Sequence, residues 1–186
     1  MSTLNTLCTT YRGYGNSKGK PSEEGTYSDA AAAYRWLTEV KKISAENVII
    51  FGKSLGGSIA AQLATKAAAQ ALVLENAFTS YIDIGRKFYP YLPVRLFARY
   101  SYPTINYIKD IDMPVMIIHS QNDEVVPFEL GEKLYEQANE PKEFVKIYGK
   151  HNDGFLVSSD LYKKAWTRWL RFLKQSKTQS THHHAS

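Results

Sequence analysis

Apolar and polar residues alternate in blocks along this chain, with short apolar runs separated by longer amphipathic stretches. Four of the runs are rich in β-branched and aliphatic residues and are bounded by turn residues, which is typical of strands buried on both faces. These predicted strands are residues 48–51, 71–74, 115–119 and 144–148. Residues 4–10 are a poorer strand candidate, and the glycine-rich residues 11–19 are predicted to form a loop.

Helical patterns lie between the predicted strands. Residues 21–42 carry Glu23 and Glu24 early and lysines at their end, an order that suits the helix macrodipole. The other predicted helices are residues 55–69, 128–138 and 159–174. Strands alternating with helices indicate an α/β fold, in which a mostly parallel sheet has helices on both faces.

The length and composition fit one globular domain. The chain has 186 residues, of which 44% are hydrophobic and 22% charged, and this excludes general disorder. We predict a single domain over residues 1–175, a small helical cap inserted at about 78–110, and a flexible polar tail over 176–186. No apolar run could span a bilayer and no signal peptide is visible, so we expect a cytoplasmic chain as written.

The net charge of +5 is concentrated in two places. After residue 160 the chain carries six Lys and Arg residues and no acid, and between residues 77 and 109 five basic residues accompany Asp83 alone. Either group could contact an anionic membrane peripherally, although a solvated helix face and a solvated loop are the simpler explanations. We expect no nucleic-acid partner. The single cysteine, Cys8, cannot form an intrachain disulfide.

A serine between glycines follows the first predicted strand. Gly52, Ser54 and Gly56 form a G-x-S-x-G pattern between a buried strand and a helix, which is typical of a nucleophile elbow. In such a turn the hydroxyl is held out at the sheet edge, and the N–H of Leu55 can face a developing oxyanion. A phosphate-binding loop would need a further glycine at position 47, where Asn47 stands. The remaining alternative is an ordinary glycine-rich turn.

A nucleophilic serine needs a base, and two histidines precede the terminal ones. His119 lies inside an apolar strand and is predicted to be a core or strand-end histidine. His151 follows the last predicted strand in a polar loop, where a catalytic base would lie. Asp123 follows the third predicted strand, and the order Ser54, Asp123, His151 is that of α/β hydrolases.

Other carboxylates compete for the role of the acid. Glu124 could replace Asp123, but the Val-Val-Pro sequence that follows places Asp123 at the turn. Glu75, at the end of the second predicted strand, could also supply the acid. Asp153 is predicted to be a loop residue or a helix cap.

Several of these segments together resemble a known group. They match α/β-hydrolase-domain proteins, and most closely the small, often membrane-anchored Bem-type serine hydrolases. Some relatives in that group are protein depalmitoylases, and others are esterases or prolyl-oligopeptidase-like. The resemblance covers about residues 11–172, and the matching segments are 11–19 (YRGYGNSKG), 52–57 (GKSLGG), 75–80 (ENAFTS), 122–123 and 151–153.

The resemblance also implies a difference at the front of the chain. Family members place three strands and a His-Gly-type loop before the segment that begins here at Tyr11, and that loop supplies the second oxyanion N–H. The last of those strands ends in an aspartate, where this chain has Thr10. We therefore expect an N-terminally truncated fold, in which the sheet either closes a gap beside residues 48–51 or pairs differently.

The resemblance and the residues predict a serine hydrolase of esters or thioesters with no cofactor. The alternatives are a truncated, weakly active or inactive paralogue that acts as a binding module, and a prolyl-oligopeptidase-like peptidase. Lys53, Phe78 and Tyr81 are candidate substrate-binding residues for a small-molecule or lipid-like acyl group. The aromatic, basic cap could receive the acyl chain, although its rings could simply pack the cap onto the sheet. We expect no metal site, since the three terminal histidines lack further ligands.

Overall fold

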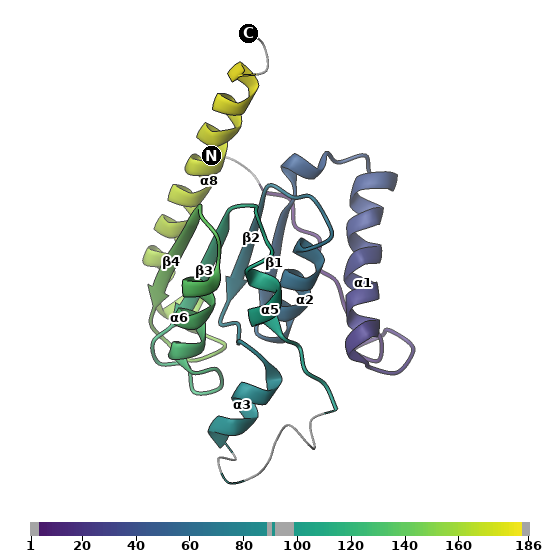
Figure 1. The fold of residues 1–186 in the computed structure, drawn as a ribbon, viewed down its shortest axis with the longest axis vertical. Helices are drawn as coiled ribbons and strands as arrows, with labels where there is room; N and C mark the ends of the chain where they lie inside the picture. Colours follow the sequence, from purple (N-terminus) through teal and green to yellow (C-terminus); the bar gives the residue numbers. More distant parts are fainter. Residues whose placement is uncertain (1–3, 89–90, 92–98, 184–186) are drawn as a thin grey trace.

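The computed structural model describes residues 4–88, 91 and 99–183. Its centre is a four-stranded, entirely parallel sheet in the order β1-β2-β3-β4 (Figure 1). The strands are β1 (Ile49–Lys53), β2 (Ala71–Glu75), β3 (Val115–Ser120) and β4 (Lys142–Ile147). Each of the four predicted strands is therefore present, and the prediction of an α/β fold with a parallel sheet is confirmed.

Helices alternate with these strands along the chain. The first helix, α1, begins after Ser22, whose hydroxyl accepts a hydrogen bond from the N–H of Gly25 at 3.1 Å. Acidic residues in its first turn complement the helix dipole. The helices are α1 (Glu23–Arg35), continued by a π-helical turn (Trp36–Val40), a 3₁₀ turn (Ala45–Asn47), α2 (Leu55–Ala64), α3 (Tyr81–Phe88), α5 (Thr104–Ile108), α6 (Phe128–Gln137), α7 (Gly154–Val157) and α8 (Ser159–His183).

Each face of the sheet has its own apolar core. On one face, alternate strand residues such as Leu72, Leu74 and Ile117 pack with α2, α5 and α6. On the other face, Val73 and Ile118 belong to a second cluster with residues of α8. Figure 1 shows α8 on one side of the sheet and α2, α5 and α6 on the other. Helices on both faces bury the sheet, as predicted from its apolar strands.

The last helix extends further than its apolar pattern indicated. We predicted a polar tail outside the fold from residue 176, but α8 remains helical as far as His183. The ammonium of Lys177 is 2.7 Å from Oδ1 of Asn47 and 3.3 Å from a carboxylate oxygen of Glu46. These contacts attach the polar part of α8 to the 3₁₀ turn. The prediction that the helix ends at residue 174 is therefore wrong, whereas the extent of the domain stays a prediction. Residues 184–186 lie outside the described part of the chain.

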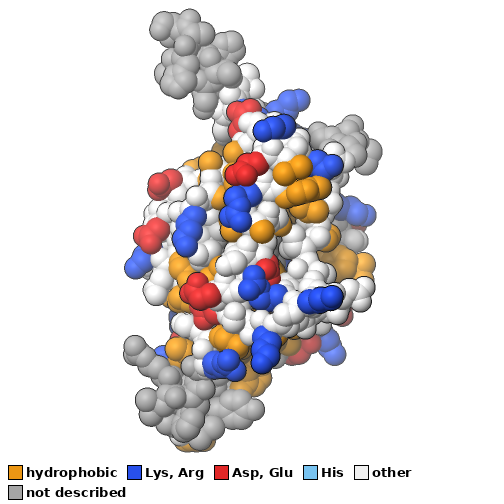
Figure 2. Space-filling view, turned by 90° about the vertical axis from the view of Figure 1, so that its right-hand side faces the viewer, with side chains coloured by type: hydrophobic (Ala, Val, Ile, Leu, Met, Phe, Trp, Pro, Cys, Tyr) orange, Lys and Arg blue, Asp and Glu red, His pale blue; other side chains and the backbone are white. Residues whose placement is uncertain are grey.

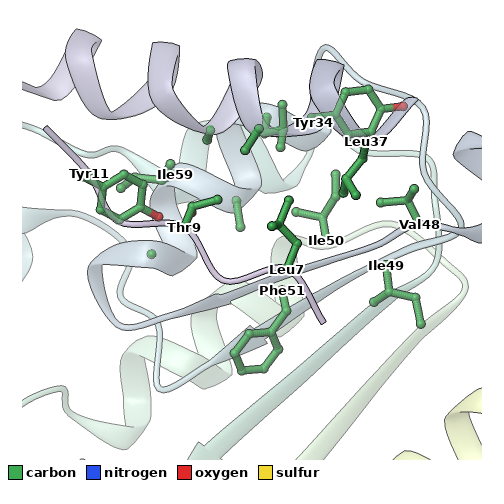
Figure 3. A pocket seen from close by; sticks show the side chains of 15 residues that line it. Leu7, Thr9, Tyr11, Tyr34, Leu37, Val48, Ile49, Ile50, Phe51 and Ile59 are labelled. Atoms are coloured by element: carbon green, nitrogen blue, oxygen red, sulfur yellow. The ribbon is translucent and has the colours of Figure 1, made fainter. Parts of the chain in front are cut away.

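The outer side of β1 is lined by an open groove. Within the described residues no strand pairs with β1 on this side, and residues 4–10 form no strand. Side chains of that segment, of α1, of β1 and of α2 line this groove, whose volume is about 120 Å³ (Figure 3). The groove reaches Gly56, but its lining contains none of Ser54, Asp123 and His151. We expected the sheet either to close the gap beside β1 or to pair differently there. In the described residues neither is seen, because no strand lies beside β1 on this side.

The predicted cap is attached by a narrow neck. The N–H of Tyr81 donates to the carbonyl of Ser101 at 2.9 Å, and the N–H of Ile105 donates to the carbonyl of Thr79 at 3.0 Å. The carboxylate of Glu23 accepts from the N–H groups of Ser101 and Tyr102 and so ties this neck to α1. The predicted cap residues Tyr89, Arg95 and Phe97 lie outside the described residues.

Charged side chains are mixed on the face that carries α1. Figure 2 shows basic and acidic side chains interspersed there, with apolar ones between them. On α8, Arg168 pairs with Glu143 and Lys177 with Glu46, so part of the basic surface predicted there has acidic partners. In the part of the chain that the structure describes, no helix is both long and apolar enough to cross a membrane.

Candidate active site

Ser54 lies in the tight turn between β1 and α2. Its φ is +52° and its ψ is −120°, a conformation that a residue with a side chain rarely adopts and that stores strain. The turn is held by a hydrogen bond of 2.9 Å from the N–H of Ser54 to the carbonyl of Glu75 on the neighbouring strand. Leu55 is the first residue of α2, so its N–H has no acceptor inside the helix. This N–H is thus available for an oxyanion beside Ser54.

Two glycines allow this turn to form, but only one of them, Gly52, is a glycine of the G-x-S-x-G pattern. A Cβ atom on Gly52 would lie 2.2 Å from the carbonyl oxygen of Gly56, so only glycine fits there. A Cβ on Gly56 would meet nothing closer than the hydroxyl of Tyr11, at 3.7 Å. A Cβ on Gly57, in contrast, would lie 2.6 Å from the Cβ of Ala77. The close approach of α2 to the end of β2 therefore requires Gly57 rather than Gly56.

Asp123 and His151 meet at the carboxyl end of the sheet. Nδ1 of His151 donates to Oδ2 of Asp123 at 2.7 Å, and the two side chains are only 8% and 0% exposed. Burial of Asp123 opposes its ionisation, but the hydrogen bonds from His151 and from the N–H groups of Val126 and Val125 outweigh it and lower the pKa of Asp123. The result is a buried carboxylate that stays charged against an imidazole.

Ser54 is connected to His151 through two adjacent residues. The carbonyl of Glu75 accepts from the N–H of Ser54, and Nδ2 of Asn76 donates to the carbonyl of His151 at 3.0 Å. Within the described residues, no hydrogen bond joins the Ser54 hydroxyl directly to the imidazole of His151. The structure thus brings Asp123 and His151 into contact after β3 and β4, and it places Ser54 at the same edge of the sheet, at the end of β1, with β2 between.

The competing carboxylates have other partners. Glu75 is buried and binds Lys53, whose Nζ is 3.1 Å from Oε1, while the hydroxyl of Tyr162 donates to Oε2 at 2.6 Å. Burial and the hydrogen bond to Glu75 raise the pKa of Tyr162. Glu75 therefore forms an ion pair with Lys53 at the ends of β1 and β2, and it makes no hydrogen bond with the imidazole of His151.

The other polar candidates, Glu124, Asp153 and His119, bind backbone groups and not the imidazole of His151. Glu124 accepts a hydrogen bond from the backbone N–H of His151 at 3.0 Å, so it contacts the loop and not the ring. Asp153 accepts from the N–H of Lys150 and lies directly before α7. His119 is fully buried in β3, and its Nε2 is 3.1 Å from the carbonyl of Val126, as expected for a core histidine.

The three candidate substrate-binding residues differ in exposure. Lys53 is bound to Glu75 and lies over the ring of Phe155 at 5.4 Å from the ring centre. Phe78 is only 2% exposed and packs edge-to-face on Tyr81, which is 44% exposed at the start of α3. Of the three, Tyr81 alone presents a large surface to a ligand. Across the described residues there is no group of three His, Cys, Asp or Glu that could hold a metal ion.

Asn76 is a site residue to which the sequence patterns assigned no role. It is 1% exposed, its φ is +46°, and its Oδ1 accepts from the N–H of Ser120 at 2.9 Å. Two signals could have found it: it is an asparagine directly after a buried strand, a residue type that tolerates a positive φ better than most, and it lies in the family-like segment 75–80. Its partner, the carbonyl of His151, could be identified only in three dimensions.

Comparison with known sequences gives one family. The profile of the prolyl oligopeptidase family matches residues 14–178. The chain is 39% identical to an uncharacterised protein of Mycobacterium tuberculosis over 168 residues, which are 90% of this chain and 60% of that protein. It is 34% identical to alpha/beta hydrolase domain-containing protein 17B of Homo sapiens over 89% of this chain and 54% of that protein. The chain thus spans less than two thirds of the length of these curated relatives.

Comparison with solved structures gives the same fold. An esterase of Pyrococcus furiosus superposes with a TM-score of 0.69 and 21% identity, over 88% of this chain and 68% of that one. An α/β serine hydrolase homologue of Coxiella burnetii superposes with a TM-score of 0.63 and 22% identity, over 83% of this chain and 65% of that one. At this identity the similarity concerns the fold alone.

Proposed function

We propose that this chain, which belongs to the prolyl oligopeptidase family within the α/β-hydrolase superfamily, is a serine hydrolase of carboxylic esters or thioesters. Ser54 is the nucleophile, His151 the general base, and Asp123 the residue that orients His151. The N–H of Leu55 stabilises the oxyanion. The contact of 2.7 Å between Asp123 and His151 is the observation that carries the proposal, because a buried carboxylate on Nδ1 leaves Nε2 to act as the base.

The reaction proceeds in two halves. Nε2 of His151 takes the proton of the Ser54 hydroxyl as Oγ bonds to the carbonyl carbon, and the Leu55 N–H faces the negative oxygen. The C–O or C–S bond then breaks, and the leaving alcohol or thiol receives the proton from His151. A water molecule attacks the acyl-enzyme by the same route, which releases the acid and restores Ser54. In an unliganded enzyme the serine–histidine hydrogen bond is often formed only once substrate binds.

The acyl group is proposed to be apolar and to lie beside the aromatic cap. Leu55, directly after the nucleophile, packs against an apolar cluster that includes the buried Phe78 and Tyr102. Tyr81 packs on both of these rings and is 44% exposed, so it presents the apolar surface. A lipid-like acyl chain fits such a surface better than a charged substrate does. Peripheral contact with an anionic membrane through the basic residues of α8 stays a prediction.

A peptidase is the second candidate, and the match to the prolyl oligopeptidase family favours it. The same serine, histidine and aspartate would then form the acyl-enzyme from an amide. An inactive binding module is the third candidate, favoured by the absence of a Ser54–His151 hydrogen bond in the described residues. The three candidates differ in whether they hydrolyse esters, hydrolyse amides and react with a fluorophosphonate probe.

A fluorophosphonate probe tests the proposal, because it labels only an activated serine. We expect labelling of the purified chain, its loss in Ser54→Ala, and its retention in the matched control Ser58→Ala. Ser58 lies in α2, the helix that follows Ser54, and its buried hydroxyl has no partner among the described residues, so removing it should cost little. Folded protein that is not labelled, or labelling that survives Ser54→Ala, would overturn the proposal.

Substrate panels then separate the enzymatic candidates. We expect p-nitrophenyl esters of medium chain length to be hydrolysed faster than the acetyl ester, and peptide anilides to be poor substrates. A flat profile over the ester series would remove the acyl-chain proposal. Anilides hydrolysed faster than esters would favour the peptidase.

A further inference from the structure

The peptide units on both sides of His151 are held by side chains from two other segments. Its N–H donates to Oε2 of Glu124 at 3.0 Å, and its carbonyl accepts from Nδ2 of Asn76 at 3.0 Å. We propose that Asn76 and Glu124 are positioning residues that clamp the backbone of His151 and thereby set its imidazole relative to Ser54. This inference rests on the proposed function, in which His151 is the base.

Asn76 is built into the ends of two strands and has little freedom to move. Its N–H donates to the carbonyl of Ile118, and its Oδ1 accepts from the N–H of Ser120, both at 2.9 Å. Its Nδ2 is then directed to the carbonyl of His151. All three contacts join groups that are buried at the carboxyl end of the sheet, so each would be costly to leave unmade.

The position of Asn76 in the chain relates His151 to the nucleophile. Asn76 directly follows Glu75, whose carbonyl accepts the N–H of Ser54 at 2.9 Å. Two consecutive residues therefore bind the backbone of the proposed nucleophile and the backbone of the proposed base. A shift of Asn76 would change the separation of these two groups even though its own side chain touches neither reacting atom.

Glu124 holds the other side of the same residue. Its neighbour Asp123 binds the ring of His151, while Glu124 binds the main chain, so two adjacent carboxylates share the control of one histidine. The hydrogen bond from the N–H of His151 is the main cause that lowers the pKa of Glu124, so its carboxylate is charged when it accepts this bond. Because Glu124 is exposed, its replacement is expected to leave the fold intact.

The identity of the side chain at position 76 matters for two separate reasons. Its positive φ is compatible with Asn, Asp and Gly, whereas only Asn supplies both the acceptor for Ser120 and the donor for His151. Asn76→Asp keeps the shape and the acceptor but turns an oxygen toward the carbonyl of His151. Asn76→Gly keeps the backbone conformation and removes both side-chain contacts.

The experiment compares Asn76→Asp with Glu124→Ala, Glu124→Gln and the matched control Glu136→Ala. Asn76→Asp and Glu124→Ala should label with the fluorophosphonate about 10- to 100-fold more slowly than the parent chain, since a misplacement of about 1 Å can cost 10²-fold. Glu124→Gln should retain most of the rate, because its amide oxygen still accepts the N–H of His151. Glu136→Ala removes an exposed charge from α6 and should label at the parent rate.

A second readout does not depend on activity. The proton shared by Nδ1 of His151 and Asp123 should give a far-downfield NMR signal, assigned by its loss in His151→Gln. We expect this signal to shift or broaden in Asn76→Asp and Glu124→Ala and to be unchanged in Glu124→Gln. Thermal unfolding of each variant separates misplacement of His151 from loss of the folded protein.

The outcomes are distinct. Parent-like labelling and NMR signals in folded Asn76→Asp and Glu124→Ala would overturn the clamp, as would labelling losses that only follow the unfolded fraction. If Asn76→Asp does not fold, the exposed Glu124 pair decides the matter. If the parent chain is not labelled at all, the proposed function fails, and the NMR comparison still decides whether the clamp exists.

Discussion

Single residues at the carboxyl ends of the strands have separate tasks. Asp123 binds the imidazole of His151, Glu124 binds its backbone, and Glu75 is paired with Lys53. These carboxylates cannot exchange roles, because each is attached at a different place along the sheet edge. The partner that each carboxylate binds is thus set by the turn or strand end that carries it.

His119 is a buried titratable residue beside this site, and it should make stability depend on pH. Its ring is fully buried, and its Nδ1 has no partner among the described residues. Burial lowers the pKa of His119, although the hydrogen bond to the carbonyl of Val126 opposes this. The unfolded chain therefore takes up a proton at His119 before the folded chain does, and stability falls as the pH drops below about 6.5.

We expect His119→Gln, which keeps a donor for Val126, to flatten this dependence. The measurement is the urea midpoint of both proteins between pH 7.5 and pH 5. The parent midpoint should fall more steeply over this range than that of the variant. Parallel curves would mean that His119 does not titrate differently in the folded and unfolded chains.

At the scale of elements, β1 and α2 approach each other closely at the junction that carries Ser54. The backbone of β1 at Gly52 lies against the carbonyl of Gly56, and α2 at Gly57 lies against Ala77. The first contact is with backbone and the second with the Cβ of Ala77, so neither involves a flexible side chain that could move aside. The angle between strand and helix, and with it the position of Ser54, depends on this contact.

Alanine substitutions at the two glycines of the G-x-S-x-G pattern should therefore differ. Gly52→Ala should lose about 1–3 kcal/mol of unfolding free energy and most of the fluorophosphonate labelling, because its Cβ collides with backbone. Gly56→Ala is the matched control and should cost far less, since its Cβ would have only an ordinary contact at 3.7 Å. Chemical denaturation and labelling rates of both variants check this. Equal effects would contradict the steric explanation.

At the scale of the whole molecule, the two edges of the sheet have different chemistry. The β4 edge carries Lys142, Glu143 and Lys146 within six residues. On β1 the one charged residue is Lys53, which is paired with Glu75, while Phe51 is 47% exposed beside an apolar groove. Charged side chains protect an edge strand from pairing with other chains, and an apolar edge lacks that protection.

We expect the chain to self-associate through the β1 edge as its concentration rises. Phe51→Lys should move the association to about tenfold higher concentration, equivalent to about 1.4 kcal/mol. Tyr148→Lys, which changes an exposed aromatic residue just after β4, is the control and should have no such effect. Sedimentation velocity over a concentration series measures both. A chain that stays monomeric at high micromolar concentration would contradict the prediction.

The sequence by itself determined the four strands, the four longer helices before, between and after them and their order, because apolar periodicity and turn residues act locally. The four strands, the serine turn at Ser54 and the positions of Asp123 and His151 after their strands follow from such local patterns. The end of α8 did not, because the contacts of Lys177 with Glu46 and Asn47 join residues far apart in the chain.

Only the tertiary structure decided which side chains meet. The parallel register of β3 with β4, in which Ser120 faces Ile147, brings the two following loops together and selects Asp123 rather than Glu75 or Glu124 for the imidazole. The register of β2 with β3, in which Glu75 faces Ile118, places Asn76 beside Ser120 and within reach of His151. The packing of α2 makes Gly57 rather than Gly56 indispensable. Contacts of this kind depend on how strands pair across the sheet, and no local pattern encodes that pairing.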